Sequence, residues 1–559
     1  MTNEQLRDHV TRRWAALKTE RSSWESHWRE LADFFLPRRG RFLVKDRKND
    51  GSKRNQNLID PTGGLAVRTL AAGMMAGLTS PARPWFKLTV PGFDAARSDA
   101  VRGWLHDVGE RMNVVFAKSN LYNVLPVIYS ELGVFGTSAM ALLEDDEDVI
   151  RAYPFTIGSY AIANSARLQS DTLYRECSMT VSQIVEQFGL ENASATVREA
   201  WRSKAFDRWM PVIHAVEPRR DRVLGRADAR NMPVRSVYLE VGAEAMTVLS
   251  DRGFEEFPIM TPRWEVTGED VYGSSPGMLA LGSVKALQLM AKKKAKAVDK
   301  IIDPPMVGDE SLRSSRASLL PGDVTYLSGT AQARGFVPAH EIQPGMLTPL
   351  LEDIANEREL VNRTFFVDLF LMLAMSDRRQ ITAREVEERH EEKLLMLGPV
   401  LERLEDELLD PLIDRTFSIM LRRGLIPDPP PELQGQDLKV EYISILAQAQ
   451  KLVGLTALER TAGFALQLAT VKPDAMDKLD TDQLIDEYAL ASGAPPTIIR
   501  SDDAVAAMRA QAQQQMAAMQ AAEAAPKVAG AMKQASEADP TAGALGALVN
   551  AAGAAPAGA

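Results

Sequence analysis

The chain has 559 residues, of which 45% are hydrophobic and 25% are charged, so it can bury a substantial core in two to four domains. Its formal net charge of −10 excludes a general affinity for nucleic acid, and any contact with DNA must be local. The single cysteine, Cys177, excludes an internal disulfide and favours a reducing compartment. We expect no signal peptide, because residues 1–20 are polar and lack an apolar core region. We expect no membrane span either, because the most apolar runs, 64–78 and 365–375, carry charged residues and fall short of ~20 residues.

The first part of the chain alternates helical and strand patterns. Residues 2–36 place leucine, valine and tryptophan at helical intervals, which predicts an amphipathic helix with its tryptophans in the core. Residues 60–90 predict a helix rich in Ala, Gly and Met, then a turn and a strand, and the small side chains favour tight packing. A further helix is predicted near 97–119.

Residues 121–155 predict a helix, a glycine-marked turn and a hairpin with an acidic tip at 144–148. The five acids lack the alternating pattern of a calcium loop, so a solvated turn is the favoured interpretation. Residues 156–270 predict strands and short helices, including strands at VRSVYLEV and MTVLS. The first 270 residues are therefore expected to form an α+β domain.

A long helix is predicted from Pro276 to about residue 302, with Ser275 as N-cap and Pro276 in the first turn. At 100° per residue, its apolar side chains share one arc and its lysines share another. The apolar set is Val284, Leu287, Ala291, Ala295, Val298 and Ile302, and the lysine set is Lys285, Lys292, Lys296 and Lys300. The lysines face either an anion or water, and from this helix alone a solvated surface is the favoured interpretation.

The segment 303–343 is too long for a turn and too short for an ordinary core, and a second long helix is predicted at 346–373. If the two long helices pack antiparallel, this small module lies at the tip of a stalk. The connection 374–381 that follows contains Arg378 and Arg379.

A capping box formed by Thr382 and Glu385 predicts the start of the next helix, which runs to about residue 423. Pro399 and Pro411 lie inside its apolar pattern and are each expected to kink it. Residues 438–444 predict a strand. Helices follow near 446–470, near 474–491 and after 501, and the Ala/Gly-rich tail 525–559 is expected to be disordered.

No catalytic, cofactor or metal motif is found in the sequence. The six histidines are scattered singly, and neither a Walker loop nor a GxSxG or GxGxxG motif occurs. The acids at 144–148 and 385–392 leave open a metal-dependent nuclease as an alternative. We therefore predict that the chain is not an enzyme.

Long segments of the chain resemble the portal proteins of short-tailed bacteriophages, the head-to-tail connector family. The resemblance covers roughly residues 1–500. It rests on DPTGGLAVRTLAAGMMAGLTSPARPWFKL, GVFGTSAM, TPRWEVTGEDVYGSSPGMLALGSVKALQLM and TAREVEERHEEKLLMLGPVLERLEDELLDPLIDRTFSIMLRRG. It implies a homo-oligomeric ring of about twelve subunits at one capsid vertex, through which a terminase motor threads double-stranded DNA and from which DNA leaves through the tail.

The resemblance also implies a helix-rich α+β portal fold with an α/β wing, a two-helix stem, a small α/β clip, a tunnel loop, a kinked helix and a helical crown. On this sequence the parts are the wing 1–272, stem helices 273–302 and 344–373, clip 303–343, tunnel loop 374–381, kinked helix 382–424, crown region 425–524 and tail 525–559.

Within that plan, the four lysines of the first stem helix are expected to meet passing DNA phosphates, and Arg378 and Arg379 to touch DNA at the tunnel loop. The other implied partners are the major capsid, scaffolding and tail adaptor proteins, without membrane insertion. The implied location is the portal vertex of the virion, after assembly in the host cytoplasm. A non-channel scaffolding protein is the alternative function.

Overall fold

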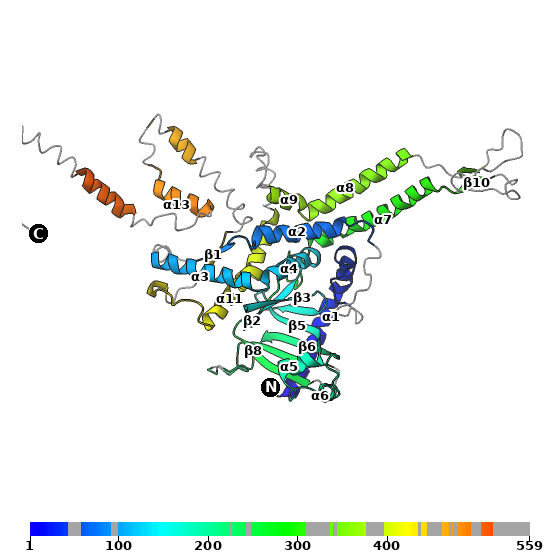
Figure 1. Ribbon diagram of the computed structural model, residues 1–559, viewed down its shortest axis with the longest axis horizontal. Helices are drawn as coiled ribbons and strands as arrows, with labels where there is room; N and C mark the ends of the chain where they lie inside the picture. Colours follow the sequence, from blue (N-terminus) through cyan, green and yellow to red (C-terminus); the bar gives the residue numbers. More distant parts are fainter. Residues whose placement is uncertain are drawn as a thin grey trace, which may run out of the picture.

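The computed structural model gives a body of helices and sheets from which a pair of helices projects (Figure 1). The described residues are 1–42, 58–90, 99–308 (without 224, 227 and 242–246), 336–338, 344–375, 396–433, 438–443, 461–468, 472, 478–492 and 505–517. The predicted class, α+β and rich in helix, is confirmed.

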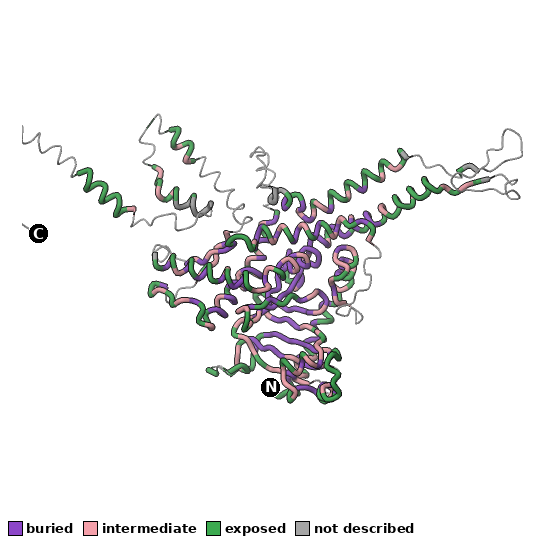
Figure 2. Tube along the Cα trace, viewed as in Figure 1, coloured by how far each residue is buried: buried purple, intermediate pink, exposed green. Residues whose placement is uncertain are grey.

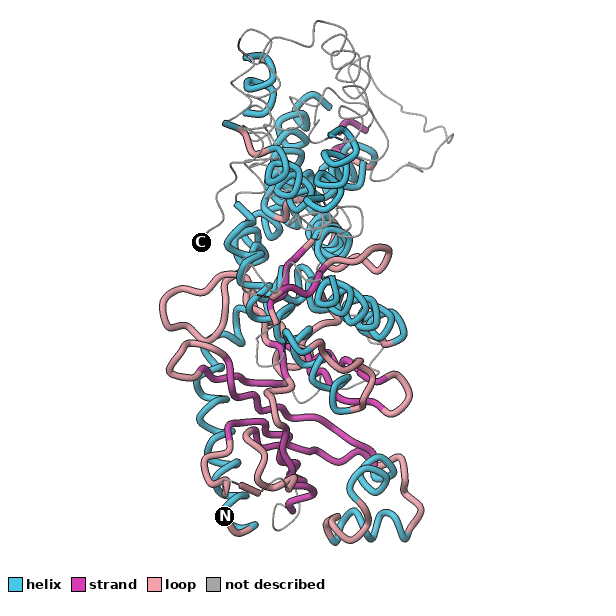
Figure 3. The backbone as a smooth tube through the Cα atoms, turned by 90° about the vertical axis from the view of Figure 1, so that its left-hand side faces the viewer, coloured by secondary structure: helices cyan, strands magenta, loops and turns pink. Residues whose placement is uncertain are grey.

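An antiparallel sheet with strand order β4-β5-β6-β7-β8 forms one end of the body, and Figure 3 shows these strands at the opposite end from most helices. The strands are β4 (Tyr160–Asn164), β5 (Ser170–Thr180), β6 (Trp209–Pro218), β7 (Val234–Glu240) and β8 (Thr247–Phe254). Because side chains alternate along a strand, Ile213 and Ala215 of β6 face helix α1 (Asn3–Phe35). Met210 and Val212 face α5 (Val181–Phe188) and α6 (Ala195–Arg202) instead.

Helix α1 confirms the prediction for the N-terminal segment. The Thr2 hydroxyl caps it by accepting a hydrogen bond from the Gln5 N–H at 3.3 Å. Trp14 and Trp28 are buried, as expected of tryptophans at helical spacing. The strands predicted at VRSVYLEV and MTVLS are β7 and β8.

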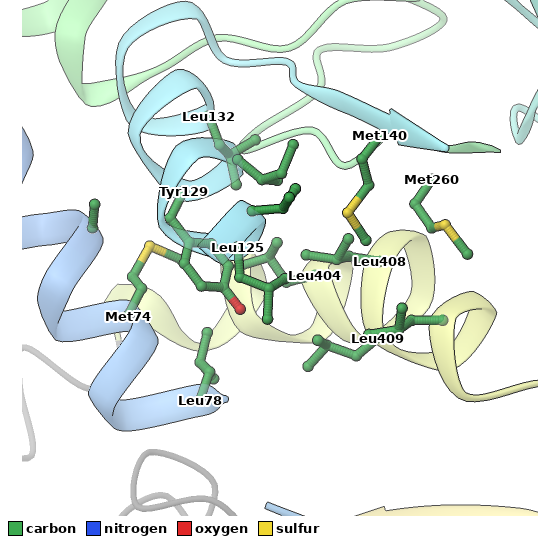
Figure 4. Packing of buried hydrophobic residues seen from close by; sticks show 14 of the residues in the cluster. Met74, Leu78, Leu125, Tyr129, Leu132, Met140, Met260, Leu404, Leu408 and Leu409 are labelled. Carbon is green, nitrogen blue, oxygen red and sulfur yellow. The ribbon is translucent and has the colours of Figure 1, made fainter. Parts of the chain in front are cut away.

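The centre of the body packs helices against a small antiparallel sheet of order β3-β2-β9. Its elements are α2 (Thr62–Leu78), α3 (Asp99–Lys118), α4 (Leu121–Phe135), β2 (Ala139–Asp145), β3 (Val149–Phe155) and β9 (Ile259–Met260). Figure 4 shows Met74, Tyr129 and Leu404 meeting in this core. A Cβ on Gly133 of α4 would lie 2.6 Å from Leu70 of α2, so the predicted tight helix packing is confirmed.

The projecting pair consists of α7 (Pro276–Ile302) and α8 (Thr348–Thr364), with a 3-10 turn at Pro344–Leu347 before α8. The two helices run antiparallel, and the antiparallel strands β10 (Met306–Gly308) and β11 (Phe336–Pro338) lie at their far end (Figure 1). For these strands the predicted position at the tip of a stalk is confirmed. The distal part of α7 is largely exposed in Figure 2.

The prediction of one continuous helix over 346–373 is wrong. Helix α8 ends at Thr364, and α9 (Val367–Met375) begins after a break at which Phe366 has φ of 55°. Phe365 is fully buried beside Phe35, with ring centroids 5.5 Å apart. The Phe370 ring of α9 packs directly on Gly73 of α2, because a side chain at that position would overlap the ring. Packing of these aromatic rings overrides the helical preference of the segment.

The next described helical residues are 396–404, and they continue through a π-helical turn, η4 (Glu405–Leu409), into α11 (Asp410–Arg422). The Asp410 N–H donates to the carbonyl of Glu405, five residues back. A proline clashes with the carbonyl four residues before it, so the wider turn accommodates Pro411. A π-helical turn therefore precedes Pro411, one of the two prolines predicted to kink this helix. The other, Pro399, lies within helical residues 396–404.

The C-terminal part is described only in pieces. Strand β12 (Lys439–Tyr442) confirms the predicted strand and pairs antiparallel with β1 (Phe86–Thr89). Helical residues 461–468, α13 (Thr481–Ser492) and helical residues 505–517 overlap the three predicted helices. The tail 525–559 lies outside the described residues.

Candidate channel surface on helix α7

Helix α7 begins at the Ser-Pro pair that the sequence predicts. The Ser275 hydroxyl accepts a hydrogen bond from the Met278 N–H at 3.1 Å and donates one to the Val134 carbonyl at 2.6 Å. A Cβ on Gly277 would lie 2.8 Å from the same carbonyl oxygen. The first turn of α7 is therefore fixed tightly against the end of α4.

The four predicted lysines follow one side of α7, but the structure divides them. Lys285 forms an ion pair with Glu30 of α1 and so lies against the body. Lys292, Lys296 and Lys300 are exposed, and within the described part of the chain they have no ion pair. A cationic surface of three lysines thus remains on the projecting half of the helix.

The predicted apolar arc of α7 also divides. Val284 and Leu287 are buried in the body. The other four members line a groove of about 510 Å³ between α7, α8 and the segment before α2. Its lining residues are Ile59, Asp60, Pro61, Ala291, Lys294, Ala295, Val298, Asp299, Ile302, Ile354 and Arg358. The buried face of α7 therefore continues outward as an open apolar groove.

A polar network at the inner end of the groove joins α7, α8 and the segment before α2. The Gln288 Oε1 accepts hydrogen bonds from the Ile59 and Asp60 N–H groups at 2.7 and 2.9 Å, and its Nε2 donates to the Asp60 carbonyl at 2.9 Å. Arg358 of α8 donates through Nε and Nη2 to Asp60 Oδ2 at 3.0 and 2.7 Å. These bonds fix the base of the projecting pair.

The Asp60 side chain is charged in this network. Burial acts to raise its pKa, but hydrogen bonds from Thr62 and Arg358 outweigh burial and hold the pKa below its usual range. The carboxylate is almost fully buried, whereas half of the Arg358 side chain is exposed. The pair therefore presents one buried anion and one cation at the groove edge.

A second anchor holds the π-helical turn. The Glu407 carboxylate accepts two kinds of hydrogen bond from Arg263. The guanidinium Nη2 donates to Oε1 at 2.6 Å, and the backbone N–H donates to Oε2 at 2.9 Å. Arg403 reaches the same carboxylate at 3.1 Å. Such charge-assisted bonds are stronger than neutral ones, so this irregular turn is fixed to the segment after β9.

Several predicted site residues lie outside the described residues. These are Arg378, Arg379, Thr382 and Glu385. Helix α9 extends to Met375, so the first two residues of the predicted loop 374–381 are helical. The acids at 385–392 are also outside the described part of the chain.

The acidic hairpin tip is engaged by the protein itself. Asp145 accepts hydrogen bonds from the Glu147 and Asp148 N–H groups, and Arg423 pairs with Glu144 at 2.7 Å. Within the described residues, no group of three or more His, Cys, Asp or Glu side chains is placed to hold a metal ion. Among the same residues, no helix is both long and apolar enough to cross a membrane.

Sequence reasoning missed the residues that anchor the helical pair. Gln288 left a signal, because it is a polar residue on the apolar arc of α7. Arg358 left none, since 298 positions separate it from Asp60 in the chain. Arg263 and Glu407 are likewise 144 positions apart.

Comparison with known proteins identifies the family. Residues 7–499 match the model of the bacteriophage head to tail connecting proteins. The chain belongs to this family. It is 51% identical to the portal protein of Salmonella phage epsilon15 over 99% of both chains. It is 46% identical to the probable portal protein of Bordetella phage BPP-1, over 93% of this chain and 94% of that one.

Two solved structures overlap with this connector more loosely. One is a chain from the virion of a native gene transfer agent particle, with 13% identity, a TM-score of 0.35 and coverage of 78% of this chain and 91% of that one. The other is from the neck of an empty gene transfer agent particle, with 13% identity, a TM-score of 0.38 and coverage of 82% and 96%. TM-scores this low do not establish a shared fold.

The predicted portal family is therefore confirmed, and with it the portal function of the chain as the channel that connects head and tail. The alternative of a non-channel scaffolding protein is not favoured by these matches. Proteins of this family are structural components of the head–tail junction.

Proposed function

We propose that about twelve copies of this chain close into a ring at one capsid vertex, and that double-stranded DNA passes through the ring in both directions. A terminase motor drives DNA inward during packaging, and the genome later leaves through the short tail. The observation that supports this proposal is the antiparallel pair α7–α8 with a small strand pair at its tip, in a chain of the connector family.

The proposed parts of the connector follow the boundaries expected from the sequence. The wing comprises 1–272, the stem 273–302 and 344–373, the clip 303–343, the tunnel loop 374–381, the kinked helix 382–424 and the crown 425–524. The wing meets the capsid and scaffolding proteins, and the clip meets the terminase and then the tail adaptor. Assembly takes place in the host cytoplasm, and the chain itself catalyses no reaction.

The exposed lysines of α7 are the proposed DNA-facing surface. DNA carries one negative charge per ~1.7 Å, so rings of Lys292, Lys296 and Lys300 attract it without a base-specific contact. Lys285 belongs to the same stripe, but its ion pair with Glu30 reduces its free charge. Arg378 and Arg379 are the proposed contacts at the tunnel loop. Sparse cations screened over ~8 Å guide a sliding duplex without holding it.

The mass and shape of the purified protein test the ring. Twelve copies of 61.5 kDa give a particle of about 740 kDa, which light scattering measures and negative-stain microscopy images as a ring with a central hole. Open filaments or a discrete dimer would contradict the proposal.

Replacing the exposed lysines tests the channel surface. We expect rings of Lys292→Ala/Lys296→Ala to assemble like wild type, but to retain or package less DNA in phage that carry them. A matched control is Lys18→Ala, which removes a half-exposed lysine from α1. If this double variant packages and retains DNA normally, the two lysines do not act on the duplex.

A further inference from the structure

The two projecting helices carry unpaired charges of opposite sign on their outer sides. Lys293 and Lys300 of α7, and Glu352 and Glu359 of α8, are all exposed. Within the described residues none of these four side chains has an ion pair. Within that part of the chain, two cations and two anions on the projecting helices are therefore unmatched.

The helical repeat places these charges away from the groove between the helices. Lys293 is two residues from both Ala291 and Ala295, and Lys300 is two residues from both Val298 and Ile302, all of which line the groove. Two residues correspond to about 200° around a helix, so both lysines point away from α8.

The same relation holds on α8. Glu352 is two residues from Ile354, and Glu359 is two residues from Val361, and both of these apolar side chains are buried. The two glutamates therefore point away from α7. One side of the helical pair is a basic edge (Lys293 and Lys300), and the opposite side is an acidic edge (Glu352 and Glu359).

The charges also match in spacing and in order along the pair. Both pairs are seven residues apart, which is about 10.5 Å of helix. Ile354 and Arg358 line the groove together with Ala291, Ala295 and Val298. Because α8 runs antiparallel to α7, Lys300 and Glu352 are the distal charges of the two edges, and Lys293 and Glu359 are the proximal ones.

We propose that the basic edge of α7 binds the acidic edge of α8 in a neighbouring copy of this chain, with Lys293 opposite Glu359 and Lys300 opposite Glu352. This inference rests on the proposed ring. Rotation about a ring axis preserves the order of residues along that axis, so the distal charges of the two edges lie at the same end of the contact between neighbouring copies. A contact between two different edges is heterologous, and heterologous contacts are those that close rings.

A second copy is the occupant that fits these observations. Duplex DNA would be repelled by the acidic edge, and it would not match a seven-residue repeat of opposite charges. The groove side of α7 already faces α8 of its own chain. The proposed contact assigns Lys293 and Lys300 to subunit pairing, so that Lys300 pairs with a neighbouring copy and not with DNA. Lys292, about 100° from Lys293 and 80° from Lys300 around the helix, then remains for the channel together with Lys296.

A charge-swap experiment tests the contact. The three variants are Lys293→Glu/Lys300→Glu, Glu352→Lys/Glu359→Lys and the combination of all four changes. We expect each double variant to raise the protein concentration needed for half assembly by at least about tenfold, because like charges then oppose each other at every subunit contact. The four-fold variant should assemble within about threefold of wild type. The matched control, Lys18→Glu/Lys292→Glu, changes the net charge equally, at one half-exposed lysine of α1 and one lysine about 100° around α7 from Lys293, and should assemble like wild type.

Mass photometry over a concentration series measures the fraction in rings, and circular dichroism of the unassembled fraction shows that each variant is folded. Double variants that assemble like wild type, or a four-fold variant that assembles no better than the doubles, would refute this contact while leaving the ring intact. A wild-type chain that forms no closed ring would refute the proposed function and this contact with it.

Discussion

The two halves of helix α7 differ in what covers them. In the first half, Val284 and Leu287 are 0% and 1% exposed and pack into the body of their own chain. In the second half, Val298 and Ile302 are 37% and 78% exposed, although they continue the same apolar face. One amphipathic pattern therefore serves two purposes, folding of the chain near the body and contacts beyond it further out.

The sharpest test of this difference places a charge on each half. Val284→Asp buries a carboxylate in the core without a partner, and we expect it to lower the free energy of unfolding by about 3–5 kcal/mol or to prevent folding. Urea denaturation of the unassembled chain measures the loss. Val298→Asp, the matched change on the outer half, should cost less than ~1 kcal/mol, because water already reaches that site. Equal losses for the two variants would show that the halves do not differ.

Breaking the network at the boundary between the halves should have an intermediate effect. Arg358→Ala leaves the buried Asp60 carboxylate without its cation, and we expect a loss of about 1–3 kcal/mol. Because the pKa of Asp60 is lowered in the folded state, its contribution to stability is present at neutral pH and lost as the pH falls below about 4. The variant should therefore lose less stability on acidification than wild type. A parallel pH dependence of the two proteins would contradict this role of the pair.

The body also contains a carboxyl group with the opposite pH behaviour. Glu131 of α4 is fully buried, and burial raises its pKa to about 7, although Arg39 and Arg41 act to lower it. The folded state then holds a proton that the unfolded chain releases near the ordinary glutamate pKa of 4.5, so stability falls as the pH rises from about 5 to 7. We expect the free energy of unfolding of the wild type to fall by about 2–3 kcal/mol between pH 5 and pH 8 through this group, and Glu131→Gln to remove that fall. Urea denaturation at the two pH values measures both.

This effect should be confined to the body, because Glu131 is enclosed in the core whereas Asp299, on the outer half of α7, is exposed to water. Hydrogen-exchange protection factors, which correct for the intrinsic pH dependence of exchange, should therefore differ between pH 5 and pH 8 in α4 and not in 291–302.

The smallest expected effects come from two glycines of α7. A Cβ on Gly282 would meet nothing within 4 Å, so Gly282→Ala should stabilise the unassembled chain by about 0.5–1 kcal/mol through helix propensity. A Cβ on Gly277 would lie 2.8 Å from the Val134 carbonyl oxygen, so Gly277→Ala should destabilise it despite the same gain in propensity. Thermal unfolding of the two variants should shift in opposite directions.

Local patterns in the sequence predict much of the fold. Helix α7 starts at Ser275 and ends at Ile302 as its capping serine, first-turn proline and following prolines require. Helix α1 and strands β7 and β8 also follow from periodicity alone. These elements are predictable because neighbouring residues in the chain determine them.

The parts that sequence reasoning missed depend on residues far apart in the chain. The break at Phe365 and Phe366 arises because Phe365 meets Phe35 and Phe370 meets Gly73. The pairing of Lys285 with Glu30, 255 positions away, removes one lysine from a stripe that looks uniform in the sequence. Periodicity identifies the face on which a side chain lies, but only the tertiary fold determines what that face meets.

The pairing of β1 with β12 has a consequence for the order of events during synthesis. Phe86 lies opposite Tyr442, so β1 stays unpaired along this edge until the ribosome has made a strand about 350 residues later in the chain. At ~5–20 residues per second, that delay is about 20–70 seconds. A nascent chain therefore cannot complete its core, and should not present finished surfaces to other copies, until most of it has left the ribosome.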